Sequence, residues 1–333
     1  KASTFNIGLD FTMLNQRLDF SFDWYQRTTS DMLVKVEYPE VLGTTAPPAN
    51  KAELRTRGWE VSVKWNDRIG NDFSYDLGFI LSDSQAEITK YENPSGTLSD
   101  YYVGQKIGEI WGYETEGFYQ SDTDVQNHAD QSKLGANWAP GDIMYKDLDG
   151  NKKINNGSNT LDDHGDLKVI GNTTPRYQYG ITANMSYKNV YLNVFFQGIG
   201  KRDFWPSSQP FWPVATQYYN TQKWFVTDSW SEDNRDAYFA RPIARETKNQ
   251  QKQTKYLQDA SYCRLKNLTV GYDFPKSWLS FLHVAKAGVY FSAENLFEFT
   301  NVKGAYDPEA AGKNGTMVYP FQRTYSFGLN VTF

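Results

Sequence analysis

Apolar and polar residues alternate along much of this chain, and this alternation limits the possible folds more than any other feature. In the final stretch the apolar positions are Tyr325, Phe327, Leu329, Val331 and Phe333, with small or polar residues between them. Successive side chains of a β-strand point to opposite faces, so a period of two predicts a strand with one apolar face. The pattern recurs at 5–13, 18–25, 59–65, 73–81, 177–187, 190–196, 264–274 and 287–297. The chain is therefore predicted to be all-β.

The length and the ends of these strands favour a membrane-spanning sheet over a soluble one. They run for about nine to eleven residues, which a tilted strand needs to cross a bilayer, whereas strands in soluble sheets have about five or six. Trp or Tyr stands near the ends of the apolar faces, as at Trp24, Trp59 and Trp65. The opposite face carries charged residues such as Asp19, Asp23, Lys64, Asp76, Arg264 and Lys266, which suit a water-filled lumen. These features predict an antiparallel transmembrane β-barrel.

The connections between the predicted strands fall into two classes. Short polar turns are expected at Asn15–Gln16, Asp67–Asp72 and Lys188–Asn189. Long polar loops are expected at about residues 28–55, 83–172, 198–256 and 300–322. Outer-membrane barrels have short periplasmic turns and long extracellular loops, so we treat residues 1–333 as one part of a barrel with long extracellular loops.

Composition excludes some classes of function and leaves others open. The formal net charge of -5 argues against nucleic-acid binding, which normally needs a basic face. No stretch approaches the roughly 18 apolar residues of a membrane helix, so a membrane would have to be crossed by strands. His128, His164 and His283 are isolated, and no catalytic set is recognisable, so we expect no enzymatic activity. A soluble surface glycan-binding β-protein and a passive porin or adhesin barrel remain as alternatives, because both would also show alternation rich in Tyr and Trp.

Several motifs together resemble one family of transporters. They are "GDIMYKDLDGN" from Gly141, "VIGNTTP" from Val169, "FFQG" from Phe195, "SWSEDN" from Ser229 and "YCRLKNLTVGYDFP" from Tyr262. In this order and spacing they resemble the C-terminal part of SusC-like (RagA-type) TonB-dependent transporters of the Bacteroidetes outer membrane. The resemblance extends from about Gly141 to Phe333 and is less diagnostic before Gly141.

The resemblance implies the rest of the functional hypothesis. The chain would be the C-terminal portion of a 22-stranded barrel, contributing roughly ten strands, with the plug domain absent from it. We expect Lys1 to be an internal residue of a longer gene product. The implied function is TonB-dependent uptake of oligosaccharides or oligopeptides across the outer membrane. The implied partners are a SusD-like surface lipoprotein lid, the TonB complex reached through the missing N-terminal part, the remaining barrel and plug, outer-membrane lipid, and a second transporter–lipoprotein pair in a dimer.

An acidic loop in the first of these motifs has the spacing of a calcium site. Asp147, Asp149 and Asn151 occupy the first, third and fifth positions of a calcium loop, and the Lys153 carbonyl would be the seventh. Lys152 replaces the usual glycine and Ser158 the usual final glutamate, so Asp162 or Asp163 would have to supply a further carboxylate; we include Asp163 in the set. Ca²⁺ is the only cofactor that the sequence predicts. A plain acidic turn remains the alternative, since Asp, Asn and Gly favour turns.

Aromatic residues are concentrated in the loop that follows "FFQG". The candidates for contact with a substrate are Trp205, Phe211, Trp212, Tyr218, Tyr219 and Trp224. Flat aromatic faces stack on sugar rings or on peptide side chains. The same rings could instead form the core that so long a loop needs. The sequence leaves both readings open.

The terminal Phe333 is predicted to act as an assembly signal, as terminal aromatic residues do in barrels of this class. Deleting Phe333 should lower the amount of protein inserted into the outer membrane, measured by surface labelling, and should leave ligand affinity unchanged. Unchanged surface levels would contradict this role.

Overall fold

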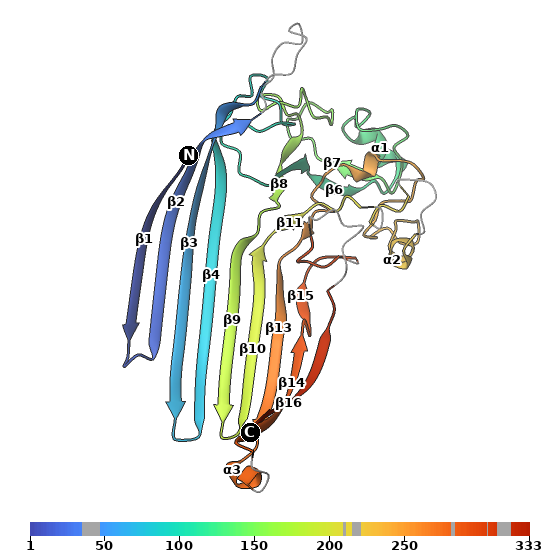
Figure 1. Cartoon of the computed structure of the whole chain (residues 1–333). Helices are drawn as coiled ribbons and strands as arrows, with labels where there is room; N and C mark the ends of the chain where they lie inside the picture. The colour runs from blue at the N-terminus through green and yellow to red at the C-terminus, as the bar shows by residue number, and fades with distance from the viewer. Residues whose placement is uncertain (35–46, 209–210, 215–220, 281–283, 305, 312–320) are drawn as a thin grey trace.

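The computed structural model describes residues 1–34, 47–208, 211–214, 221–280, 284–304, 306–311 and 321–333. Its main feature is an antiparallel sheet in the order β1-β2-β3-β4-β9-β10-β13-β14-β16. The short strand β15 also pairs with β13. Figure 1 shows these strands side by side, with hairpin turns at one end and the large loops at the other. The predicted all-β antiparallel fold is confirmed.

The strands of the main sheet are long. Their bounds are β1 Ala2–Met13, β2 Leu18–Val34, β3 Ala49–Ile69, β4 Phe73–Lys90, β9 Arg176–Tyr187, β10 Val190–Lys201, β13 Tyr262–Asp273, β14 Lys286–Glu294, β15 Glu298–Thr300 and β16 Thr324–Thr332.

The register of the sheet keeps like faces together from strand to strand. Phe22 lies opposite Leu9 on β1 and Val61 on β3, whereas the adjacent Asp23 lies opposite Gly8 and Glu60. The apolar face is unusually open, with Phe5 60% and Phe327 84% exposed. Exposed apolar rings in such numbers suit contact with lipid. The predicted alternation is thus confirmed on both edges of the sheet.

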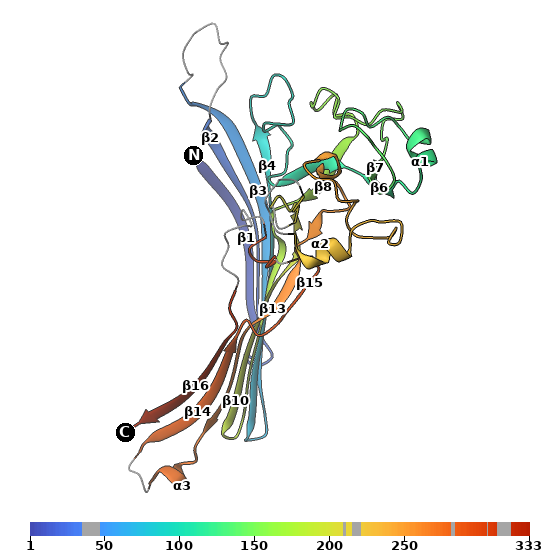
Figure 2. The same ribbon diagram turned by 90° about the vertical axis from the view of Figure 1, so that its right-hand side faces the viewer.

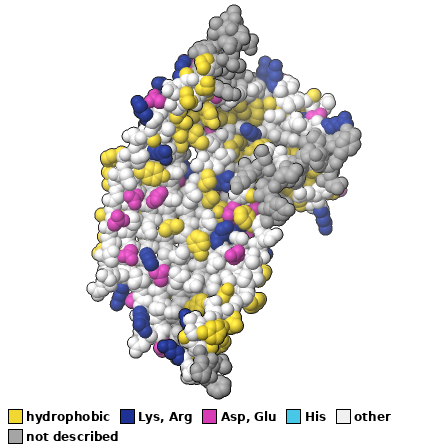
Figure 3. Space-filling model, viewed as in Figure 1, with side chains coloured by type: hydrophobic (Ala, Val, Ile, Leu, Met, Phe, Trp, Pro, Cys, Tyr) yellow, Lys and Arg dark blue, Asp and Glu magenta, His cyan; other side chains and the backbone are white. Residues whose placement is uncertain are grey.

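The other face of the sheet is polar. Figure 3 shows acidic and basic side chains scattered over the strands, separated mostly by white polar or backbone surface and by small apolar patches. Some of them pair across strands, as Lys64 and Asp76 do at 3.2 Å. A polar face opposite an apolar one is the arrangement of a barrel wall with an aqueous lumen.

Large rings on this sheet lie over glycines of the neighbouring strand. Tyr191 lies opposite Gly271, and Tyr290 lies opposite Gly328. A Cβ at either glycine would come within 2.1 Å of the tyrosine ring. Glycine at these positions therefore lets the ring lie flat on the partner strand, a device that fixes register.

The strands extend further than the sequence analysis expects. Residues 28–34 and 49–55, assigned to a loop there, belong to β2 and β3, whose pairing continues to Val34 and Ala49. Residues 83–90 likewise belong to β4. Polar strand residues continue the ladder after the apolar alternation has stopped, because backbone hydrogen bonds do not depend on side-chain polarity. β3 has 21 residues, about twice what a bilayer requires.

The turns at the other end of the sheet are short, with one exception. β1 and β2 are joined through Leu14, Asn15 and Gln16, all with positive φ, and β9 and β10 through Lys188 and Asn189. β13 and β14 are instead joined by a longer segment that contains α3, Lys276–Leu279. Of the helices that the structure describes, none has both the length and the apolar composition needed to cross a membrane.

The long loops fold into a body at the end of the sheet opposite these turns, which we call the loop body (Figures 1 and 2). Its elements are β5 Glu109–Tyr113, β6 Thr115–Phe118, α1 Asp122–Asn127, β7 Ile143–Tyr145, β8 Leu167–Asn172, β11 Asp203–Phe204, α2 Lys223–Thr227, η2 Lys248–Gln250 and β12 Gln258–Asp259. The pairs β5–β8, β6–β7 and β11–β12 form small separate sheets.

The loop body has a core of its own, and that core is mostly aromatic. Phe211, Phe239 and Tyr256 are almost completely buried, and their rings contact one another at centroid distances of 5.4 to 6.1 Å. Tyr113 and Tyr145 extend the same cluster toward β5 and β7. Segments more than a hundred residues apart in the chain therefore share one hydrophobic centre.

Replacing Phe239 by Ala should destabilise the loop body by about 3–5 kcal/mol, the usual cost of emptying a buried phenylalanine site. Hydrogen–deuterium exchange should show faster exchange across the residues 211–256 that the structure describes and unchanged exchange in β2 and β3. Val226→Ala on α2, which removes a side chain that is 65% exposed, is the matched control. Equal exchange in the two variants would contradict a shared core.

Candidate functional site

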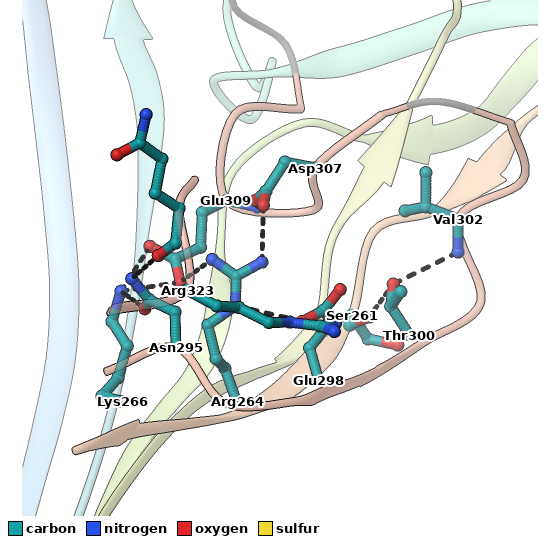
Figure 4. Close-up of polar contacts among 11 residues, drawn as sticks. Ser261, Arg264, Lys266, Asn295, Glu298, Thr300, Val302, Asp307, Glu309 and Arg323 are labelled. Carbon is teal, nitrogen blue, oxygen red and sulfur yellow. Dashed lines mark hydrogen bonds and ion pairs between the residues drawn. The ribbon is translucent and has the colours of Figure 1, made fainter. Parts of the chain in front are cut away.

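The polar face of the sheet meets the loop body at a cluster of ionic side chains around Arg264 (Figure 4). β13 carries Arg264, whose guanidinium lies 2.6 Å from Asp307 and 2.8 Å from Glu309. Lys266, two residues further on, lies 2.9 Å from the same Glu309. The register of β10 with β13 shifts between Phe195, which pairs with Asn267, and Phe196, which pairs with Leu265. Lys266 is therefore the extra residue of a bulge, and a bulge changes the direction of such a side chain.

Charges in this cluster are balanced. The Arg264 side chain is 1% exposed, with its Nε 4.0 Å from Glu298, which also pairs with Arg323. Three cations, at 264, 266 and 323, thus face three carboxylates, at 298, 307 and 309. A buried charge needs such pairing to be tolerated. The cluster ties the segment that carries Asp307 and Glu309 to the wall, and its charges are used internally rather than offered to a ligand.

The structure places four of the six aromatic candidates together in or beside the core of the loop body. Phe211 is completely buried and Trp212 is 8% exposed, so both pack inside it. Trp205 and Trp224 are partly buried at its edge, 6.0 Å from Trp212 and 4.6 Å from Phe239 respectively. Tyr218 and Tyr219 lie outside the described residues. A substrate could reach Trp205 and Trp224 without unfolding the core, and their role in binding stays a prediction.

A polar network beside this core was not identified from the sequence. Asp142 is fully buried and accepts hydrogen bonds at 2.9 Å from Arg241 and Asn249, while its ion pair with Lys248 also measures 2.9 Å. Burial opposes ionisation of Asp142, but these partners outweigh it and hold the pKa of its carboxyl below the usual range. The motif "GDI" was visible, but its partners come from about a hundred residues away, and no local spacing indicates them.

The acidic loop brings three carboxylates together. Ligand atoms of Asp147, Asp149 and Asp166 lie within 4.8 Å of one another. Lys152 has φ of 60°, the left-handed conformation that favours glycine, which a calcium loop has at this position. Oxygen atoms from three carboxylates this close together are chemically suited to Ca²⁺.

Three of the predicted ligands make hydrogen bonds within the protein. Asp163 is not one of the three carboxylates that lie together, and its own carboxylate accepts hydrogen bonds from the backbone N–H and hydroxyl of Ser158. Asp166, which the spacing of a calcium loop does not indicate, supplies the third carboxylate instead. The Oδ1 of Asn151 accepts from the backbone of Lys153, and the Lys153 carbonyl accepts from the Asn155 amide, so a metal would have to share these groups.

Backbone amides already stabilise the charged form of this loop. Partial burial raises the pKa of Asp147, but hydrogen bonds from the backbone amides of Lys152 and Gly150 lower it. Together the hydrogen bonds outweigh burial, so the pKa of Asp147 lies below its usual value. Asp166 accepts from the amides of Leu148 and Asn155. These hydrogen bonds hold the carboxylates of Asp147 and Asp166 in place, and they favour the charged form of Asp147, the state in which a carboxylate can bind a cation.

Comparison with known proteins finds relatives along the whole chain. No family model matches it. It is 30% identical over 354 residues to TonB-dependent receptor P3 of Formosa agariphila, an alignment that covers 98% of this chain and 34% of that protein. It is 26% identical over 348 residues to TonB-dependent receptor SusC of Bacteroides thetaiotaomicron, covering 100% of this chain and 32% of SusC.

Solved structures show the same fold. The RagAB peptide transporter superposes with a TM-score of 0.74 at 24% identity, covering 100% of this chain and 35% of the matched chain. Another structure of RagAB, described as a peptide importer in the "open-open" state, also gives a TM-score of 0.74. The chain spans about a third of the length of the relatives that it matches.

Calcium binding at the acidic loop remains a prediction. In calorimetric titrations Asp149→Ala should weaken Ca²⁺ binding at least tenfold, and it should abolish any Ca²⁺-dependent protection of residues 147–158 from hydrogen exchange. Asp162→Ala removes an equal charge from a neighbouring exposed site and should leave both unchanged. Identical protection of the loop in calcium and in chelator would contradict a bound metal.

Proposed function

The chain is a relative of the SusC-like TonB-dependent receptors, which are outer-membrane proteins, and from this premise we propose that it forms part of the wall of a nutrient importer. The predicted resemblance, barrel fold class and outer-membrane localisation are confirmed by these relationships. The relatives are receptors and transporters, which agrees with the expectation of no enzymatic activity. About two thirds of each relative has no counterpart here, so the activity of the whole transporter is part of the proposal.

In this proposal the polar face of the sheet lines the passage and the apolar face contacts lipid. The loop body stands at the extracellular mouth, where it contacts the incoming solute. The solutes are oligosaccharides or oligopeptides, which are too large for diffusion through porins. Two observations support this range: SusC-like motifs occur in this chain, and RagAB, with the same fold, is described as a peptide importer.

The partners follow from the same premise and are proposals in turn. A SusD-like surface lipoprotein would cover the loop body, and a dimer of the transporter–lipoprotein pair would be the assembly. The remaining strands and a plug domain, outside this chain, would complete the barrel and contact TonB. The contribution of this chain would be wall, lumen charges and loops.

One observation carries the proposal more than the others: the alignment with a receptor at 30% identity includes the loop body as well as the strands, since it covers 98% of this chain. A passive pore needs a wall but has no need of a separately folded extracellular body with a buried core. An importer that must bind its solute before transport does need a defined surface at its mouth.

Uptake measurements in cells test this function. Cells that express the whole transporter containing this chain would be given fluorescent oligosaccharides and oligopeptides of several lengths. We expect uptake of at least one class to depend both on the transporter gene and on tonB. Uptake that needs the transporter but not tonB would identify a passive pore, and uptake that needs neither would contradict import altogether.

A further inference from the structure

Two lysines from distant parts of the chain lie over one tyrosine ring in the loop body. The Nζ of Lys303, in the segment after β15, lies 4.1 Å from the centroid of the Tyr238 ring. The Nζ of Lys255, just before β12, lies 5.8 Å from the same centroid and 4.4 Å from that of Phe118. Cation–π contacts of this kind bring two like charges close together on an aromatic surface.

Neither ammonium group has an acidic partner in the part of the chain that the structure describes. Among the described residues no carboxylate oxygen lies within 4.0 Å of the Nζ of Lys255 or of Lys303, whereas Arg241, Lys248, Arg264 and Lys266 all have one. Two carboxylates stand in the neighbourhood of Lys255, those of Asp228 and Asp236, both beyond ion-pair distance. Asp228 is already used, since it accepts the backbone N–H of Tyr238 at 3.0 Å.

The unpaired state of these lysines is costly in a partly buried site. Burial lowers the pKa of Lys255, and the charge of Lys303 lowers it further. Both effects disfavour the charged form, and an anion placed beside the two ammonium groups would reverse them. The Arg264 cluster shows the opposite case, in which every cation has its carboxylate within the chain.

The site is held in place by a buried glutamine. Gln258 on β12 is 3% exposed; its amide donates to the Tyr238 hydroxyl at 2.7 Å and accepts from the backbone N–H of Lys303 at 2.9 Å. One side chain therefore fixes both the ring and the segment that carries the second lysine. Lys303 is exposed and Lys255 half-buried, so the lysine pair is open to solvent on one side.

We propose that Lys255 and Lys303 form an anion subsite that binds a carboxylate or sulfate group carried by the oligomeric substrate. Ammonium groups act as point charges and suit either anion, and three donors on each can satisfy several oxygens. The Tyr238 and Phe118 rings supply an apolar surface beside the charges. The subsite rests on the proposed import function, because it lies in the loop body that would meet the solute.

Binding measurements on the whole detergent-solubilised transporter test the subsite. The probes are trigalacturonic acid and triglutamate, which carry carboxylates on two different backbones, and neutral galactotriose. The variant is Lys255→Gln with Lys303→Gln, and the matched control is Lys252→Gln, an exposed lysine of the same loop. We expect the double variant to bind at least one acidic probe at least tenfold more weakly than wild type does. The affinity of wild type for that probe should also fall as the salt concentration is raised.

The two acidic probes identify the source of the anion. A loss confined to trigalacturonic acid indicates an acidic oligosaccharide, and a loss confined to triglutamate indicates an acidic peptide. Lys255→Arg with Lys303→Arg should retain binding, and unchanged affinity of the double Gln variant for neutral galactotriose shows that this variant has not misfolded. Equal affinities of wild type and the double Gln variant for both acidic probes, or an equal loss in Lys252→Gln, would overturn the subsite.

A failed subsite can be told from a failed import function. If tonB-dependent uptake of a neutral oligomer persists, and the double Gln variant binds both acidic probes as tightly as wild type does, the subsite is wrong and the import function stands. If no oligomer is taken up by the transporter, the import function is wrong.

Discussion

The rest of the structure depends on the antiparallel hydrogen-bond ladder that runs from β1 to β16. A hydrocarbon layer contains no water to satisfy backbone groups, so each N–H and C=O within it must be paired along the sheet. The register of that ladder also decides which side chains meet, and a slip by one residue would turn Phe22 and Phe327 to the polar side. In the transporter that we propose, further strands pair with the outer sides of β1 and β16 and close the wall.

The loops are attached to this wall, but contacts within the loop body stabilise their fold. An aromatic core around Phe211 and Phe239 gives the loop body a hydrophobic centre, and Asp142 with its three partners joins segments that are distant in sequence. Arg264 then fastens the segment of Asp307 and Glu309 to β13. These charges are balanced within the chain. Lys255 and Lys303 have no such carboxylate partner among the described residues, and that difference separates a structural ion cluster from a candidate binding surface.

The sequence predicted those features that depend on local spacing. The faces of the strands followed from a period of two, and the turns at Asn15–Gln16 and Lys188–Asn189 from short polar breaks between apolar runs. Strand length was underestimated because the alternation of apolar and polar residues stops before the paired ends of β2 and β3. The motifs also indicated the family, since they combine several specific residues in a fixed order.

The parts that sequence did not predict arise from contacts between distant segments. Phe211 and Trp205 looked alike as loop aromatics, yet one is buried and the other partly open, because the fold places Phe239 and Tyr256 around the first. Asp166 rather than Asp163 joins Asp147 because the chain returns to the acidic loop only after a further turn. Lys255 and Lys303 are 48 positions apart in the numbering, and only their shared contact with Tyr238 relates them.

Spin-label accessibility along β2 in the assembled transporter tests the central claim most directly, namely that one face of this sheet meets lipid and the other meets water. Single cysteines would replace Phe20, Ser21, Phe22 and Asp23 in a Cys263→Ser background and carry a nitroxide. We expect labels at 20 and 22 to collide mainly with oxygen dissolved in the bilayer, and labels at 21 and 23 to collide mainly with a water-soluble nickel complex. Equal accessibility of all four labels to the nickel complex would contradict this claim.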